Sequence, residues 1–142
     1  MPVVSVTRLR VRSWRFLPGF LLLAMRSARQ AQGSKGNLAV RVLNDRQRTF
    51  WTSTSWESDA AIKAFMLAEP HRTAMKKLLE WCDEAALVHW MQPESELPAW
   101  TEAHRRLVEE GRQSKVNHPS QAHRSYSIPL PAGAAKREVR LK

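Results

Sequence analysis

The residues whose types and spacing could do chemistry lie between Phe50 and His71. Trp56, Glu57 and Ser58 end a strand-like run, and His71, the one histidine of this stretch, follows a helix-like segment. A neutral imidazole can act as a base or bind haem iron. A lone histidine can equally cap a helix or satisfy a buried carbonyl group, and we favour this structural interpretation of His71.

Other chemistries have less support in the sequence. Glu57 and Asp59 lie two residues apart on a turn, which suits helix capping better than acid–base catalysis. The sequence has no glycine-rich phosphate loop and no G-x-S-x-G element. The single cysteine, Cys82, cannot form an internal disulfide, and no Cys/His cluster has the spacing of a zinc site. We therefore expect no metal site.

The net charge of +10 is distributed unevenly along the chain: residues 1–55 carry +9, residues 56–111 carry −5 and the remainder carries +6. Such asymmetry can mark proteins that bind nucleic acids or membrane surfaces. No nucleic-acid motif accompanies it, so a solvated basic face and a basic tail explain it better. Arg8 and Arg10, on one face of an expected strand with Arg12, could bind an anion, but we favour a solvent-facing edge.

Residues 14–33 have a basic lead-in and a short apolar run, as a secretory signal would. Pro18 interrupts the run, however, and Ala24, Ala28 and Ala31 continue it in helical phase. The run is also far short of the roughly 20 apolar residues that span a bilayer. We therefore expect an amphipathic helix in a cytoplasmic protein with no membrane partner.

The elements that must position these residues follow from apolar periodicity. The expected strands span residues 3–11, 37–43, 49–56 and 84–92, and the expected helices begin at Pro18, at Ser58 or Asp59, and at His71, with a break at Pro70. This βαββαβ order is the ferredoxin-like split motif, an α+β fold with a four-stranded antiparallel sheet and helices on one face. The other face would carry Trp51 or Phe50 and Trp90 or His89, and an exposed apolar face requires a partner.

An additional helix is expected at residues 98–110, with Pro98 in its first turn and Gly111 just past its end. The domain therefore spans residues 1–111. Residues 112–142 are basic and show no apolar periodicity, so we expect a flexible C-terminal extension.

The run Trp56-Glu57-Ser58, followed by a helix and His71, resembles the turn that recurs in the dimeric α+β barrel superfamily, the antibiotic-biosynthesis-monooxygenase-like proteins. The chain is most similar to an uncharacterised branch of that superfamily, a domain of unknown function, and the resemblance covers about residues 3–111. It is carried further by Phe65, Glu80-Trp81, Trp90, Pro98, Glu102-Ala103, Arg106-Leu107 and Gly111.

The resemblance implies a homodimer in which two sheet faces close into a barrel. It also implies candidate activities, because the superfamily includes cofactor-free monooxygenases acting on polycyclic phenols and haem-degrading enzymes. The functional Asn, Trp and His of the haem degraders fall on Thr7, Phe65 and Met75 here. All three positions differ, so haem degradation of that type is not favoured. We expect no cofactor, with haem bound by His71, one turn earlier, as the alternative.

We therefore expect a monooxygenase-like enzyme, or a binder, acting on a small apolar or aromatic ligand between helices and sheet. His71 is the candidate catalytic base, and Thr7, Trp56, Phe65 and Met75 are the candidate pocket residues. Three alternatives stay open: a non-catalytic dimeric module, a haem-binding protein, and a nucleic-acid-associated basic protein.

Overall fold

A computed structural model describes residues 1–69, 71–132 and 138–142. Its centre is an antiparallel sheet in the order β4-β1-β3-β2. The strands are β1 (Val3–Val11), β2 (Asn37–Asn44), β3 (Thr49–Trp56) and β4 (Cys82–Met91). This is the strand order that the βαββαβ motif produces, so the predicted α+β fold with an antiparallel sheet is confirmed.

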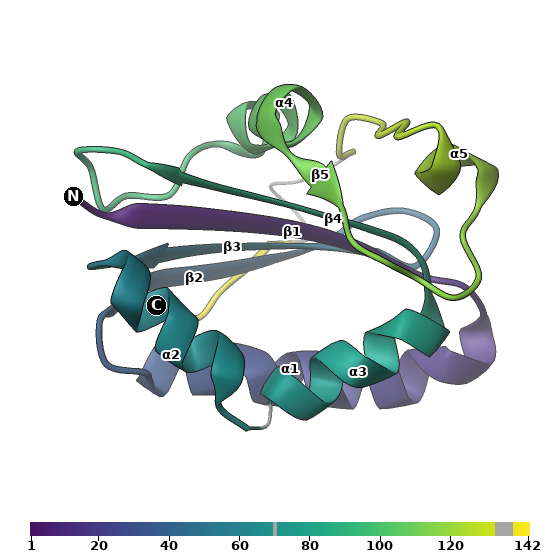
Figure 1. Cartoon of the computed structure of the whole chain (residues 1–142), viewed down its shortest axis with the longest axis horizontal. Helices are drawn as coiled ribbons and strands as arrows, with labels where there is room; N and C mark the ends of the chain where they lie inside the picture. The colour runs from purple at the N-terminus through teal and green to yellow at the C-terminus, as the bar shows by residue number, and fades with distance from the viewer. Residues whose placement is uncertain (70, 133–137) are drawn as a thin grey trace.

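One face of the sheet is covered by three helices (Figure 1). They are α1 (Leu17–Gly33), which follows the short 3-10 turn η1 (Trp14–Phe16), α2 (Asp59–Leu67) and α3 (His71–Trp81). The Ser58 hydroxyl accepts a hydrogen bond from the Ala61 N–H at 3.2 Å, so Ser58 is the N-cap of α2. The break expected at Pro70 falls on a position outside the described residues.

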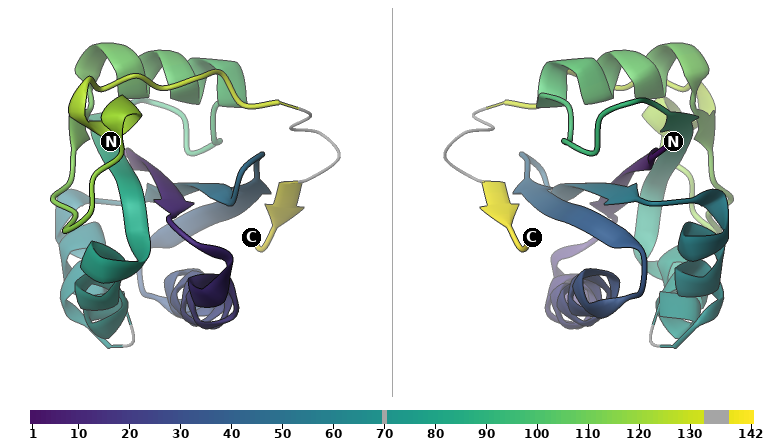
Figure 2. Two further views of the ribbon diagram at one scale, coloured as in Figure 1. Left: turned by 90° about the vertical axis from the view of Figure 1, so that its right-hand side faces the viewer. Right: turned by 90° about the vertical axis from the view of Figure 1, so that its left-hand side faces the viewer.

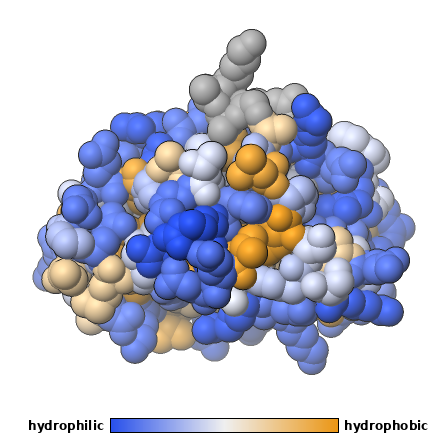
Figure 3. All heavy atoms as spheres, turned by 90° about the horizontal axis from the view of Figure 1, so that it is seen from above, coloured by the Kyte–Doolittle hydropathy of each residue, from blue (hydrophilic) through white to orange (hydrophobic). Residues whose placement is uncertain are grey.

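The other face of the sheet is covered by α4 (Trp100–Glu110), as the side views in Figure 2 show. Trp100, Ala103 and Leu107 are buried against the sheet residues Val6 and Trp51. Seen from this side, the surface is mostly hydrophilic with only small apolar areas (Figure 3). The expectation of an open apolar face is therefore wrong for this chain, because its own fourth helix fills that face.

The segment after α4 also differs from the expected flexible extension. It contains β5 (Arg112–Gln113), α5 (Gln121–Arg124) and β6 (Glu138–Arg140). β5 pairs with β4 and β6 pairs with β2, so the sheet has six strands, in the order β5-β4-β1-β3-β2-β6, rather than the expected four. Edge strands carry unpaired backbone N–H and C=O groups, and the two short strands satisfy some of these groups.

Candidate functional site

A row of partly buried side chains crosses the middle of the sheet. Thr7 of β1 lies opposite Thr52 of β3 and Leu87 of β4, and Thr52 lies opposite Val42 of β2. All four side chains are only partly buried. Directly paired residues point to the same face of a sheet. We call this set the central row.

The central row points toward the helices. Thr7 is two residues from Leu9, and Thr52 is two residues from Phe50; Leu9 and Phe50 both pack in the cluster that contains Phe20 of α1. Side chains two apart on a strand share a face. Residues of central strands beneath a helical layer are normally buried, so their partial exposure means that solvent reaches the sheet between the helices.

His71 is the first residue of α3, on the same side of the sheet as the central row. α3 leads directly into β4, which runs back above it (Figure 1). The start of α3 therefore lies beneath the sheet, away from the Cys82 end of β4.

Three aromatic rings connect the sheet to this helix. The rings of Trp56 and Phe65 are stacked, with centroids 5.0 Å apart and planes at 30°. The ring of Phe65 is also 4.4 Å from that of His71. Trp56 is fully buried, and its indole N–H donates to the Thr54 hydroxyl at 2.9 Å. The stack fixes the Phe65 ring between the end of β3 and the start of α3.

Two hydrogen bonds orient His71. Its backbone N–H donates to the Gln30 side-chain oxygen at 2.8 Å, and its Nδ1 lies 3.3 Å from the Met66 carbonyl oxygen. A carbonyl oxygen only accepts, so the neutral ring carries its proton on Nδ1 and keeps a lone pair on Nε2. Burial lowers the pKa of His71, and the Met66 carbonyl opposes this effect. The ring is therefore neutral near pH 7, as a base or metal ligand must be.

The structure brings the predicted residues together only in part. Phe65 contacts both Trp56 and His71, and Thr7 lies in the central row. Met75 lies one turn beyond His71 on α3 and is 43% exposed. Within residues 1–69, 71–132 and 138–142, no group of three or more His, Cys, Asp or Glu side chains is arranged to hold a metal ion.

A buried ionic cluster lies on the opposite face, and sequence reasoning missed it. Arg8, expected at a solvent-facing edge, is 5% exposed and donates from Nη1 to Glu84 at 2.8 Å. Arg10 and the Ser120 hydroxyl each donate to the other Glu84 oxygen at 2.9 Å. Burial pushes the pKa of Glu84 upward, but the bonds and charges of these partners outweigh it and lower the pKa. No pattern in the sequence connects β1 with Ser120.

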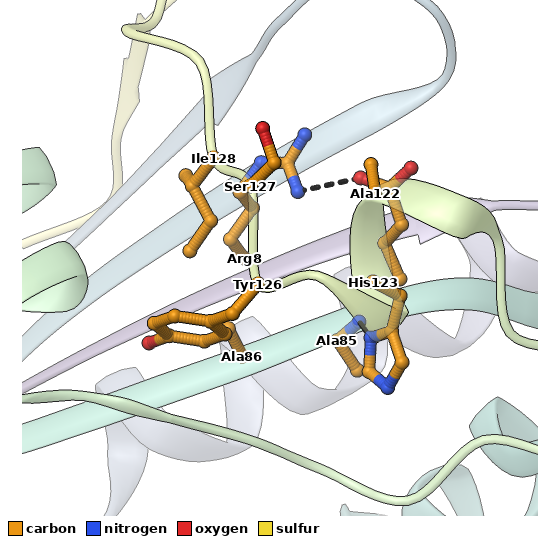
Figure 4. Close-up of a pocket in the computed structure, with 9 residues that line it drawn as sticks. Arg8, Ala85, Ala86, Ala122, His123, Tyr126, Ser127 and Ile128 are labelled. Carbon is orange, nitrogen blue, oxygen red and sulfur yellow. Dashed lines mark hydrogen bonds and ion pairs between the residues drawn. The ribbon is translucent and has the colours of Figure 1, made fainter.

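Two hollows lie outside the layer between the helices and the sheet. A cavity of about 10 Å³, enough for one water, is lined by Arg8, His123, Tyr126 and Ile128 among others (Figure 4). A more open groove of about 170 Å³ is lined by residues that include Arg41, Leu97 and Arg140. Neither is lined by His71.

The Cys82 thiol is buried, and burial raises its pKa to about 12, so it is not activated as a nucleophile.

Solved structures of other proteins share this fold. An antibiotic biosynthesis monooxygenase is 12% identical and has a TM-score of 0.58 over 65% of this chain and 99% of that one. SnoaB, a cofactor-independent oxygenase from Streptomyces nogalater, is 15% identical with a TM-score of 0.56 over 69% and 98%. A conserved protein from Methanosarcina mazei is 12% identical with a TM-score of 0.58 over 65% and 93%. The chain therefore has the antibiotic-biosynthesis-monooxygenase-like α+β fold.

The family of this chain is identified by a match between its sequence and a family model. Residues 16–119 match the family described as "Domain of unknown function (DUF3291)", and the chain belongs to that family. This confirms the predicted resemblance to an uncharacterised branch of the monooxygenase-like superfamily. No curated protein matches the sequence. Among the described residues, no helix is both long and apolar enough to cross a membrane.

Proposed function

We propose that this protein binds a small, flat, mostly apolar ligand between its helices and its sheet, with His71 as the base. The observation that carries the proposal is the partial exposure of the central row beneath the helical layer. Thr7 and Thr52 would supply hydroxyl groups, and Leu87 and Val42 would supply apolar surface. Sites of this composition suit small aromatic ligands that carry a few polar groups.

The state of His71 supports proton abstraction in this site. Its Nδ1–H is directed to the Met66 carbonyl, and the Nε2 lone pair is the acceptor. A base with a lowered pKa stays unprotonated near neutral pH and can take a proton from a phenol or a carbon acid. The resulting electron-rich anion can react with O₂ without a cofactor. Phe65, held by the stack on Trp56, would form the aromatic wall, and Met75 would lie at the rim.

The proposed site is built within one chain. The homodimer expected from the sequence would use the sheet face that α4 covers, so we expect a monomer instead, and the ligand site does not depend on association. α4 lies on the opposite side of the sheet from His71, so association of two chains over α4 would leave the central row unchanged.

A thermal-shift screen with polycyclic phenols, naphthols and anthrones would test the proposal. We expect at least one compound to raise the melting temperature of the wild type. His71→Asn should remove O₂ consumption while keeping binding, and Thr52→Phe, which fills the central row, should remove binding. His118→Ala, on an exposed histidine of the C-terminal segment, is the matched control and should behave as the wild type does.

Three results would contradict the proposal. The first is the absence of any shift across the panel, and the second is binding that Thr52→Phe leaves unchanged. The third is a Soret band in the absorbance spectrum of the purified protein, which would favour the haem-binding alternative instead.

A further inference from the structure

The outward side of α1 carries an apolar stripe. Trp14 in η1 is 68% exposed and Leu22 is 54% exposed, whereas the other five tryptophans are buried or half-buried. Leu21 and Met25 are exposed as well. Leu21, Leu22 and Met25 lie at neighbouring positions around α1, and Trp14 precedes them in η1. The buried residues of α1 (Phe20, Ala28 and Ala31) pack toward the sheet.

Basic side chains flank this stripe. Arg15, Arg26 and Arg29 are exposed, and the Arg48 guanidinium lies 5.3 Å from the centre of the Trp14 ring. The sequence has no acidic residue before Asp45, which is itself buried. We call the exposed residues Trp14, Leu21, Leu22, Met25, Arg26 and Arg29 the α1 face.

The neighbouring helix α3 adds further positive charge beside the α1 face. α3 lies beside α1 (Figure 1), and its Arg72, Lys76 and Lys77 are exposed. The only acidic residue in α3, Glu80, already pairs with Arg12 at 3.0 Å and with His118 at 3.1 Å. α1 and α3 therefore present exposed apolar side chains within a positively charged surface.

We propose that the α1 face docks this protein on a membrane surface that contains anionic lipids. A helix with Trp and Leu on its exposed side and arginines at their flanks can lie in the plane of the interface. There the apolar side chains enter the acyl boundary and the guanidinium groups contact phosphates, each adding to the attraction. The chain would lie on the bilayer and not cross it.

Charge complementarity distinguishes this partner from two others. A second copy related by a two-fold axis would bring the positively charged α1 face of one chain against the same face of its partner, which is unfavourable. A nucleic acid would pair with the arginines but would leave Leu22 and Met25 without apolar contacts. An anionic lipid surface satisfies both kinds of side chain. The proposal is independent of the ligand site proposed above.

Vesicle flotation of the full chain provides the test. We expect binding to vesicles of 30% phosphatidylglycerol in phosphatidylcholine and much weaker binding to pure phosphatidylcholine. The double variants Leu22→Asp/Met25→Asp and Arg26→Glu/Arg29→Glu should each reduce the fraction bound by on the order of tenfold or more. Two matched controls lie away from the α1 face: Val108→Asp on the exposed side of α4, and Lys115→Glu/Arg124→Glu in the segment that follows α4. Both should bind vesicles as the wild type does.

Circular dichroism melting of each variant separates loss of the surface from loss of the fold. Because the substituted side chains are exposed, we expect wild-type melting curves. The proposal is overturned if the wild type does not float with anionic vesicles, or if the α1-face variants float as well as the controls. It is also overturned if light scattering shows a dimer that Leu22→Asp/Met25→Asp dissociates, because the face would then join two chains. Retention of the wild type on duplex DNA but not on vesicles would likewise assign the face to nucleic acid.

Discussion

At the scale of single residues, the strongest electrostatic feature is the Arg8–Glu84 pair. Removing two charges from water costs several kcal/mol per ion, and the cost is offset only when the remaining polar atoms are also bonded. Glu84 receives bonds from Arg8, Arg10 and Ser120. The Arg8 Nε, in contrast, is buried with no hydrogen-bond partner among the described residues. The cluster is stable as a unit and sensitive to the loss of any member.

We predict that Glu84→Gln lowers the free energy of unfolding by about 3 kcal/mol or more, because it leaves the Arg8 charge buried without a counter-ion. Guanidinium denaturation followed by tryptophan fluorescence would measure the loss. Asp59→Asn, which breaks the exposed Lys63–Asp59 pair, is the control and should cost less than about 1 kcal/mol. An equal decrease in the free energy of unfolding in the two variants would contradict the prediction, because the buried pair would then contribute no more than the exposed pair.

A second prediction, on how stability depends on pH, follows from the protonation of His71. Its pKa lies below the ordinary value of 6.5 in the folded chain because the ring is desolvated. The unfolded chain therefore binds more protons below pH 6.5, so stability is complete above that pH and falls as the pH decreases toward the folded pKa. We expect the melting temperature to fall between pH 7.5 and 5.5, and to fall less in His71→Asn. His123, whose pKa burial also lowers, should account for part of the remaining slope. A melting temperature constant over this range would contradict the assignment.

At the scale of elements, residues 112–132 act as a strap across β4. The Ser120 hydroxyl contacts Glu84, the Ala85 N–H donates to His123 Nδ1 at 3.3 Å, and the Tyr126 hydroxyl donates to the Leu107 carbonyl at 2.6 Å. These contacts connect α4, the sheet and the strap. The sequence suggested an extension that the domain does not need, whereas the structure assigns it a role in covering buried charge.

We predict that truncation after Gly111 lowers the melting temperature by many degrees or causes aggregation, because it exposes Arg8 and Glu84 and removes two edge strands. Tyr126→Phe, which deletes one hydroxyl, should cost about 1 kcal/mol. Differential scanning fluorimetry on the two proteins would compare these effects. A truncated chain with the same melting temperature as the wild type would contradict this prediction, because it would show that the domain does not need residues 112–142.

At the scale of the whole molecule, α4 decides how the sheet face is used. Val4, Val6, Trp51, Val88 and Trp90 would form an exposed apolar surface without it. Trp100, Ala103 and Leu107 bury that surface within the chain. A second chain is therefore not needed to remove it from water.

We predict that the full chain is monomeric at micromolar concentration in multi-angle light scattering. A chain that ends at Leu97 should associate or aggregate, because its apolar sheet face is then uncovered. A stable dimer of the full chain would show instead that the outer surface of α4 joins two subunits.

The sequence by itself determined the elements and their order. Alternation of apolar residues defined the strands, the Ser58 cap and the helical stripe defined α1 and α2, and the βαββαβ order then implied the sheet order. The resemblance of the run from Trp56 to His71 to the superfamily selected Trp56, Phe65 and His71 as site residues. These features depend on residues near one another in the chain, so periodicity and capping reveal them.

Only the tertiary structure decided which surfaces are covered. Periodicity shows that Trp100 and Leu107 share a face of a helix, but not that this face lies on Trp51. Glu84 pairs with Arg8 and Ser120, which joins residues that are 76 and 112 positions from Arg8. The short strands β5 and β6 form because free sheet edges lie beside them, not because their residues favour strands. Contacts of this kind depend on how the layers pack, and a single sequence carries no local signal of them.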